Sequence, residues 1–160
     1  VAIFLGYSIG SAPIVSYHYG ARNSEELKNL LTKSLKMIGV WGVALFALAQ
    51  LIASPLARIF VGYDPNLFDL TRHGFRIFCL AFLVNGFNIY GSSFFTALNN
   101  GLLSALISFL RTLVFQIASV LLLPMIFGID GIWGAVFVAE ILTLCVTIIC
   151  LAKKQKVYHY

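Results

Sequence analysis

Long apolar blocks separated by short polar segments run through the whole sequence. Five of these blocks cover residues 1–19, 37–57, 77–98, 101–127 and 132–151. A helix needs about 20 mostly apolar residues to cross roughly 30 Å of hydrocarbon, and each block approaches or exceeds that length. The blocks do not alternate between polar and apolar residues, as the shorter strands of a membrane β-barrel would. We therefore predict an all-α integral membrane protein with five transmembrane helices.

The polar segment 20–36 connects the first two apolar blocks. Asn23 or Ser24 can cap a helix there, and the two glutamates that follow suit its first turn. Leucines recur at helical spacing, namely Leu27, Leu30, Leu31 and Leu35. One apolar face on an otherwise polar helix favours a position on the membrane surface. We therefore predict a surface helix that precedes the second span.

Three further connections are recognised by their turn-forming residues. Residues 58–76 contain glycine, aspartate, proline and asparagine close together, which predicts a turn-rich aqueous loop. Residues 99–101 read Asn-Asn-Gly and residues 128–131 read Gly-Ile-Asp-Gly, and both predict tight turns. Because such connections are short, the helices on either side of each should run antiparallel.

The composition excludes an ordinary soluble domain. The chain is 60% hydrophobic and only 11% of its residues are charged, whereas soluble domains carry roughly 25% charged residues. Its mean hydropathy is +0.92. The formal net charge is +5, but the basic residues lie between apolar blocks. Membrane topology therefore explains them, and nucleic acid is not an expected partner.

Lysine and arginine are divided unequally between the two sides of the predicted spans. The side with segments 20–36 and 152–160 carries seven, namely Arg22, Lys28, Lys33, Lys36, Lys153, Lys154 and Lys156. The other side carries three, namely Arg58, Arg72 and Arg76. Because basic residues favour the cytoplasm, we predict a cytoplasmic loop at 20–36 and a cytoplasmic C-terminal tail at 152–160. We expect a multi-pass protein of the plasma membrane, typical of a bacterial inner membrane.

Four stretches of the sequence carry a family resemblance. Residues 10–22 read GSAPIVSYHYGAR, residues 105–111 read ALISFLR, and residues 123–134 include LP and FGIDGIWG. The last span contains AEIL at residues 139–142. Together these stretches resemble the multidrug and toxic compound extrusion (MATE) family, with His18 at a position where asparagine is common.

The resemblance implies a twelve-helix transporter built from two six-helix lobes. This chain would then be an incomplete C-terminal lobe, from the eighth helix to the twelfth, and the N-terminal lobe of the same protein would precede Val1. Members of the family export drugs or other amphiphilic organic cations in exchange for Na⁺ or H⁺, by alternating access. The expected partners are membrane lipid, such small organic cations and the preceding lobe, and the expected coupling ion is Na⁺ or H⁺.

Glu140 is the only acidic residue inside a predicted span. Because hydrocarbon disfavours a charged carboxylate, the side chain should face the interior of the bundle. It is a candidate for a proton or cation site, or for a counter-charge to a cationic drug. The alternative is a structural hydrogen bond to a neighbouring helix.

Arg111 is the only basic residue inside a span. It can extend towards the membrane surface or pair with Glu140, since the last two spans are antiparallel neighbours. Gln116 lies in the same span, where its amide could line a cavity or join two helices.

Asn85 and Asn88 lie three residues apart in the third span and therefore share a helix face. The family resemblance implies that a carboxylate at the position of Asn85 helps to bind Na⁺ in sodium-coupled relatives. An amide supplies an oxygen ligand but cannot titrate, so a metal site on this helix is uncertain. Hydrogen bonding between helices is the alternative for both residues.

Pro13 and Gly10 are candidates for helix bending in the first span. Proline removes a backbone donor and clashes with the preceding turn. Bending during transport and static packing are both compatible with this pattern.

No enzyme signature fits the sequence. Residues 6–10 read GYSIG and match the hydrolase pattern GxSxG, but that pattern requires a strand-turn-helix elbow and here falls inside an apolar span. The cysteines lie in apolar blocks without metal-ligand spacing, which predicts buried thiols at Cys79, Cys145 and Cys150. We expect neither an enzyme nor a bound cofactor.

The sequence leaves two alternative functions to consider. A lipid-linked precursor flippase of the same superfamily should carry several cavity arginines to hold a pyrophosphate, whereas only Arg111 lies inside a span. A membrane-embedded structural subunit without transport has no need of intramembrane residues such as Glu140 and Asn85. An antiporter is therefore the predicted function.

Overall fold

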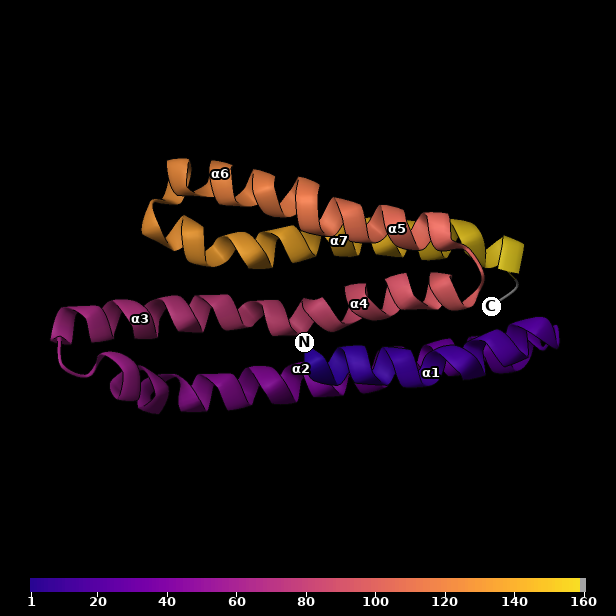
Figure 1. Cartoon of the computed structure of the whole chain (residues 1–160), viewed down its shortest axis with the longest axis horizontal. Coiled ribbons are helices and arrows are strands. Elements are labelled where there is room, and N and C mark those ends of the chain that lie inside the picture. The colour runs from indigo at the N-terminus through magenta and orange to yellow at the C-terminus, as the bar shows by residue number, and fades with distance from the viewer. Residues whose placement is uncertain (159–160) are drawn as a thin grey trace.

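Helices account for almost all of the structure, a computed structural model that describes residues 1–158 (Figure 1). The chain forms α1 (Ala2–Gly20), α2 (Ser24–Val61), α3 (Pro65–Phe78), α4 (Phe82–Ala97), α5 (Gly101–Phe109), α6 (Gln116–Phe127) and α7 (Ile129–Tyr158). A 3₁₀ turn at Cys79–Ala81 joins α3 to α4, and a π-helical segment at Leu110–Phe115 joins α5 to α6. The described residues contain no strand, so the predicted all-α fold is confirmed.

Local sequence signals set the ends of several helices as expected. The Asn23 side chain caps α2 by accepting a hydrogen bond from the Glu26 amide at 3.2 Å. Asn100 caps α5 in the same way, through the Leu103 amide at 3.1 Å. Gly128 ends α6 with a φ of +59°, which glycine adopts without strain. The tight turns predicted around residues 99–101 and 128–131 are therefore confirmed.

The separate surface helix predicted within residues 20–36 is wrong. These residues form the first part of α2, which runs without interruption for 38 residues. Leu27 is buried, and Leu30, Leu31 and Leu35 pack against the core. The apolar face that suggested a membrane surface is therefore covered by neighbouring helices. No proline or glycine interrupts the backbone hydrogen bonds between Ser24 and the apolar part of α2.

The turn-rich loop predicted for residues 58–76 is also largely wrong. α2 continues to Val61, and α3 already begins at Pro65. Asp64 caps α3 through the Asn66 amide at 2.9 Å, and the proline occupies the first turn, where its missing N–H is tolerated. The turn signals in this segment therefore mark one short connection between two helices.

Four of the helical segments are long and apolar enough to span a membrane. They are 24–61, 65–97, 101–127 and 129–158. α1 matches the first predicted span in position, but it is not among these four. The predicted spans 37–57, 77–98 and 132–151 are each longer at one or both ends as helices, and the helical segment 101–127 agrees with its prediction. The predicted tail begins as part of α7, and its last two residues, 159–160, lie outside the described residues.

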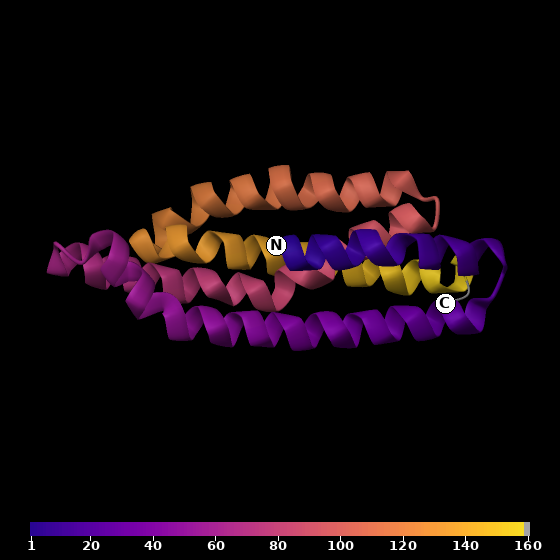
Figure 2. The ribbon, with the colours of Figure 1, turned by 60° about the horizontal axis from the view of Figure 1, so that its bottom comes forward.

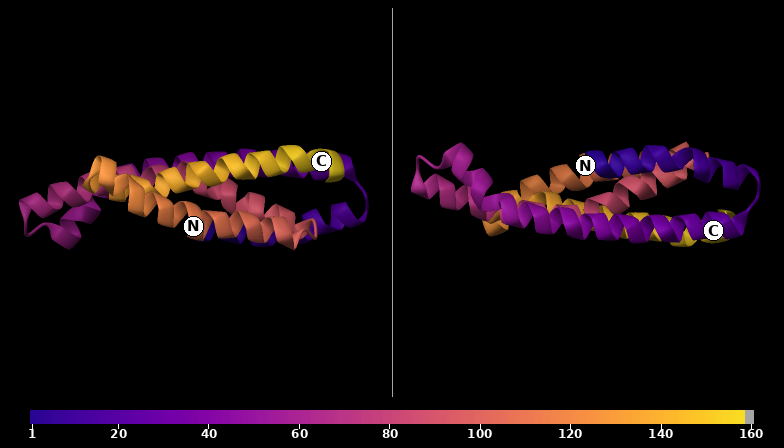
Figure 3. Two further views of the ribbon diagram at one scale, coloured as in Figure 1. Left: turned by 90° about the horizontal axis from the view of Figure 1, so that it is seen from above. Right: turned by 90° about the horizontal axis from the view of Figure 1, so that it is seen from below.

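α4 occupies the centre of the bundle and packs against α1, α2, α5 and α7. Figure 2 shows α5–α6 and α2 at opposite edges, with α1, α4 and α7 between them. The core is built around buried side chains of α4 such as Tyr90, Phe94 and Phe95. The α2–α3 connection projects beyond the other helices at one end of the bundle (Figure 3). Polar residues on α4 are therefore placed where several helices meet.

The cysteines do not share one environment. Cys79 is buried as predicted, Cys150 is partly buried, and Cys145 is exposed on the outside of the bundle. The prediction of a buried thiol is therefore wrong for Cys145. α7 is apolar on its outer as well as its inner side. Apolar neighbours in the sequence therefore do not distinguish a cysteine that faces inwards from one that faces outwards.

Gly131 allows α7 to begin directly beside the end of α6. A Cβ atom at this position would lie 2.3 Å from the carbonyl oxygen of Leu123, a backbone atom that cannot rotate aside. We expect Gly131→Ala to lower the free energy of unfolding by about 1–3 kcal/mol, measured by thermal unfolding of the full-length protein in detergent. Gly101→Ala is the matched control, because nothing lies within 4 Å of its added Cβ. Equal melting temperatures for the two variants would contradict the prediction.

Candidate functional site

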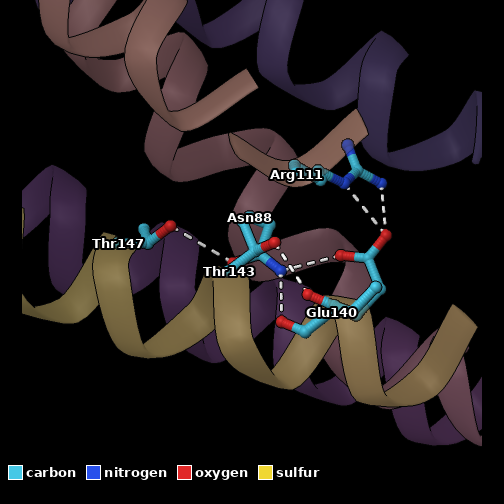
Figure 4. A network of polar contacts seen from close by, with 6 residues as sticks. Asn88, Arg111, Glu140, Thr143 and Thr147 are labelled. Carbon is cyan, nitrogen blue, oxygen red and sulfur yellow. Dashed lines mark hydrogen bonds and ion pairs between the residues drawn. The ribbon is translucent and has the colours of Figure 1, made fainter. Parts of the chain in front are cut away.

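A buried polar network lies where α4, α7 and the π-helical segment meet (Figure 4). Arg111 donates from Nε and Nη2 to Oε1 of Glu140, at 2.9 and 2.6 Å. Asn88 donates from Nδ2 to Oε2 of Glu140 at 2.7 Å, and also to the Glu140 backbone carbonyl at 2.8 Å. One carboxylate thus joins three elements that are distant in sequence.

The network supplies hydrogen-bond partners to polar atoms whose burial without partners would be unfavourable. The Glu140 side chain is 5% exposed and the Arg111 side chain 25%. Both carboxylate oxygens accept hydrogen bonds, and one of them receives two from a cation. Charge-assisted bonds of this kind are the stronger ones. A charge inside the bundle is tolerated because of these partners.

Threonines on α7 extend the network behind Asn88. Thr147 donates to Oδ1 of Asn88 at 3.2 Å, while Thr143 donates to the Ala139 carbonyl of its own helix. Gly91 lets α4 approach α7 at this level, because a Cβ there would lie 2.3 Å from Cγ2 of Thr147. Both ends of the Asn88 side-chain amide are therefore hydrogen-bonded: its oxygen accepts from Thr147 and its nitrogen donates to Glu140.

Arg111 lies in an irregular part of its helix. Residues 110–115 adopt π-helical hydrogen bonding between two α-helical segments. Such segments are rare and often occur at functional sites. A π turn also changes which side chains share a helix face, so α-helical spacing does not relate the residues before this segment to those after it.

The structure brings together three of the predicted site residues and separates the others. Arg111 pairs with Glu140, one of the two alternatives considered for it, and Asn88 joins them. Asn85 is buried nearby on α4, but its Oδ1 atom has no hydrogen-bond partner among the described residues. Gln116 begins α6, is half-buried, and makes no side-chain hydrogen bond within residues 1–158.

The helix-bending candidates lie outside this network. α1 continues as one helix through Pro13, so the structure contains no break there. Pro13 and Gly10 are both exposed, and nothing lies within 4 Å of a Cβ built on Gly10. Bending of α1 during transport stays a prediction.

Sequence reasoning missed the threonines and serines around the network. Thr147 touches Asn88, and Ser92, Ser104 and Ser108 form a hydroxyl cluster between α4 and α5. Their spacing offered a weak signal, since Ser104 and Ser108 lie four residues apart and share a face with Arg111. Within the described residues, no three histidine, cysteine or acidic side chains come close enough to hold a metal ion.

Comparisons with known proteins agree with this architecture. An outward-facing and an inward-facing conformation of a multidrug resistance MATE family transporter of the MOP superfamily each match with a TM-score of 0.88 and 19% identity. A MATE protein in complex with MaL6 matches with a TM-score of 0.87, also at 19% identity. Each match covers 98% of this chain but only 35–36% of the other.

The sequence comparison gives the family directly. The comparison with curated proteins finds no match. The MatE family model, in contrast, matches residues 1–122, which is most of the chain. The chain therefore belongs to the MatE family of membrane transporters.

Proposed function

We propose that this chain is the C-terminal part of a secondary antiporter that exports amphiphilic organic compounds, organic cations among them, in exchange for Na⁺ or H⁺. The observation that carries the proposal is the buried Arg111–Glu140 ion pair, which joins α7 to the π-helical segment inside the bundle. Replacing a buried ion pair by apolar residues is often neutral or stabilising, so stability alone gives little reason to place one here. A role in binding or coupling supplies that reason.

Alternating access requires a lobe that moves without unfolding. The chain matches the outward-facing and the inward-facing relative with the same TM-score of 0.88. This equality supports a helix group that keeps its internal arrangement while the lobes change their mutual orientation, as in other transporters built from repeats. The buried network would then move together with these helices and keep its internal geometry.

Proton coupling would act on the carboxylate of Glu140. Protonation removes the negative charge that holds Arg111, and it turns one acceptor oxygen into a donor. The bonds that join α7 to the π-helical segment and to Asn88 would then rearrange. A proton gradient can drive this local change. The change requires no metal ion.

Sodium coupling would use oxygen atoms near the same level of the bundle. The unpartnered Oδ1 of buried Asn85 is one such oxygen, and Asn85 lies one helical turn from Asn88 on the same helix. Hard cations prefer carboxylate and amide oxygens. The two ions thus lead to different expectations, because only proton coupling requires Glu140 to change its charge.

Efflux from vesicles tests the proposed function. The full-length protein is reconstituted with a fluorescent organic cation inside, and a Na⁺ gradient or a proton gradient is imposed separately. We expect one gradient to drive export against the dye concentration and to lose its effect when an ionophore collapses it. Dye export that is indifferent to both gradients, or no export at all, would overturn the antiporter.

Orientation is proposed on the positive-inside rule and can be tested by labelling. The α1–α2 connection and the C-terminal end lie at one end of the bundle, and the α2–α3 connection at the other (Figure 1). In a Cys-free background, single cysteines at Glu26 and Gln155 should react only from the cytoplasm, and one at Asn66 only from outside. Labelling of Glu26 and Asn66 from the same side would contradict this orientation.

A further inference from the structure

A groove of about 270 Å³ opens between α1, α4, α5 and the π-helical segment. We call it the serine groove, because its polar lining is Ser8, Ser92, Ser93, Thr96, Ser108 and Arg111. Its remaining walls are apolar side chains of α1 and α4, including Leu5 and Ile89. Pockets for drug-sized ligands measure roughly 300–1,000 Å³. The serine groove can therefore hold one polar end of such a ligand, while its apolar part extends outwards.

The hydroxyl groups of the groove are connected to one another. The Oγ1 atom of Thr96 lies 2.7 Å from Oγ of Ser104, and Ser92 lies 2.9 Å from both Ser104 and Ser108. Arg111 follows Ser108 by three residues along the chain. Ser92, Thr96 and Ser108 are thus linked by hydrogen bonds, partly through Ser104, and Arg111 lines the same groove.

One hydroxyl of the groove has no partner. Ser8 is 2% exposed and lines the groove, yet its Oγ atom makes no hydrogen bond among the described residues. A buried hydroxyl without a partner is unfavourable by about 1–3 kcal/mol in general. A ligand in the groove removes this penalty if the Ser8 side chain turns towards it, because its Oγ atom is fully covered in this structure.

The charge of the groove is set by Arg111. Its Nε and Nη2 atoms bind Glu140, whereas Nη1 makes no hydrogen bond among the described residues. Glu140 does not line the groove, and no other acidic side chain does. The groove therefore offers a guanidinium group and several hydroxyls to a ligand, and no carboxylate lines it.

We propose that the serine groove binds an anionic, oxygen-rich group, such as a carboxylate or a phosphate, of the amphiphile that the protein exports. Arginine matches such groups in charge and geometry, and the hydroxyls supply further donors. This proposal rests on the proposed transport function and adds to it a preference, among the exported amphiphiles, for compounds that carry an acidic group, zwitterions included. A purely cationic compound finds no counter-charge in the groove.

Binding of two matched dyes tests the proposal. The probes are a rhodamine with a free carboxylate and the ethyl ester of the same dye, which differ only in the acidic group. Fluorescence anisotropy is measured on the full-length protein in nanodiscs of neutral phosphatidylcholine. We expect the acid to bind about tenfold more tightly than the ester, the size of effect expected from hydrogen bonds to a charged group. An ester that binds as tightly as the acid, or an absence of acid binding, overturns the proposal.

Variants locate the preference within the groove. Arg111→Gln combined with Glu140→Gln removes both charges, and it should abolish the preference for the acid. Ser108→Ala should reduce the preference severalfold, and it keeps the test decisive if the double variant does not fold. Ser119→Ala, a buried serine on α6 outside the groove lining, is the control and should have no effect. A preference that survives both groove variants overturns the proposal.

The two proposals fail separately. Ion-driven export of dye, measured in vesicles, without any preference for the acid would refute the groove assignment and leave the antiporter in place. Preferential binding of the acid without ion-driven export would support the groove and refute the antiporter.

Discussion

Replacing Glu140 by glutamine should strongly reduce ion-coupled export while the protein remains folded. Glutamine keeps the shape of the side chain and one carbonyl oxygen, so Asn88 retains an acceptor at about the same place. The substitution removes the titratable group and the charge that holds Arg111. If protons drive transport through this residue, we expect the rate to fall by about a hundredfold or more, the lower end of the range for a positioned proton-transfer group.

The measurement is initial dye efflux from vesicles at several pH values, for the full-length protein at matched levels. Asp130→Asn is the control, because this acidic residue lies on the same helix but is exposed and pairs with His73 at the end of the bundle. Exposed pairs contribute little, so this variant should export normally. Normal export by Glu140→Gln across the neutral range would show that Glu140 is structural and that coupling resides elsewhere.

Removing only the cation should harm the fold more than removing the carboxylate charge. Arg111→Met leaves Glu140 buried with Asn88 and no positive charge beside it. Breaking one side of a buried pair typically lowers the free energy of unfolding by roughly 3–5 kcal/mol, and the partial exposure of Arg111 favours the lower end. Thermal unfolding in detergent, followed by circular dichroism and size-exclusion chromatography, measures the loss.

The double variant Arg111→Met with Glu140→Gln identifies the cause. Because no unpaired charge remains, most of the lost stability should return, and the two effects should be clearly non-additive. Lys33→Met is the control for loss of a basic residue, since Lys33 lies on the part of α2 predicted to be cytoplasmic and has no ion pair among the described residues. Additive losses in the double variant would indicate that Arg111 stabilises the bundle by packing alone.

The local part of the fold followed from the sequence. A helix in hydrocarbon must satisfy its backbone hydrogen bonds internally, so apolar length alone predicts a helix and its approximate bounds. Asn23 and Asn100 begin helices through their side-chain caps, and Gly128 ends α6 through its positive φ. The family, too, could be inferred from the motifs in residues 10–22 and 105–142, because their order and spacing are specific.

The continuity of α2 could not be derived in the same way. An amphipathic face on residues 24–36 fits a membrane surface or a neighbouring helix equally well, because both bury leucine side chains. Only the packed bundle shows that Leu27 lies against other helices. Similarly, the turn residues in 58–76 indicated a break but not that a helix would restart at Pro65.

The sequence by itself determined that the chain forms long apolar helices and that Glu140 and Arg111 are exceptional within them. It did not determine their partners, because a helix that is apolar on all sides does not indicate which face turns inwards. Asn88 meets Glu140 across 52 residues, and the serine groove joins α1 to residues about 85–100 positions later. The tertiary structure decided these contacts, since they depend on how each helix is rotated about its axis and how the helices pack together.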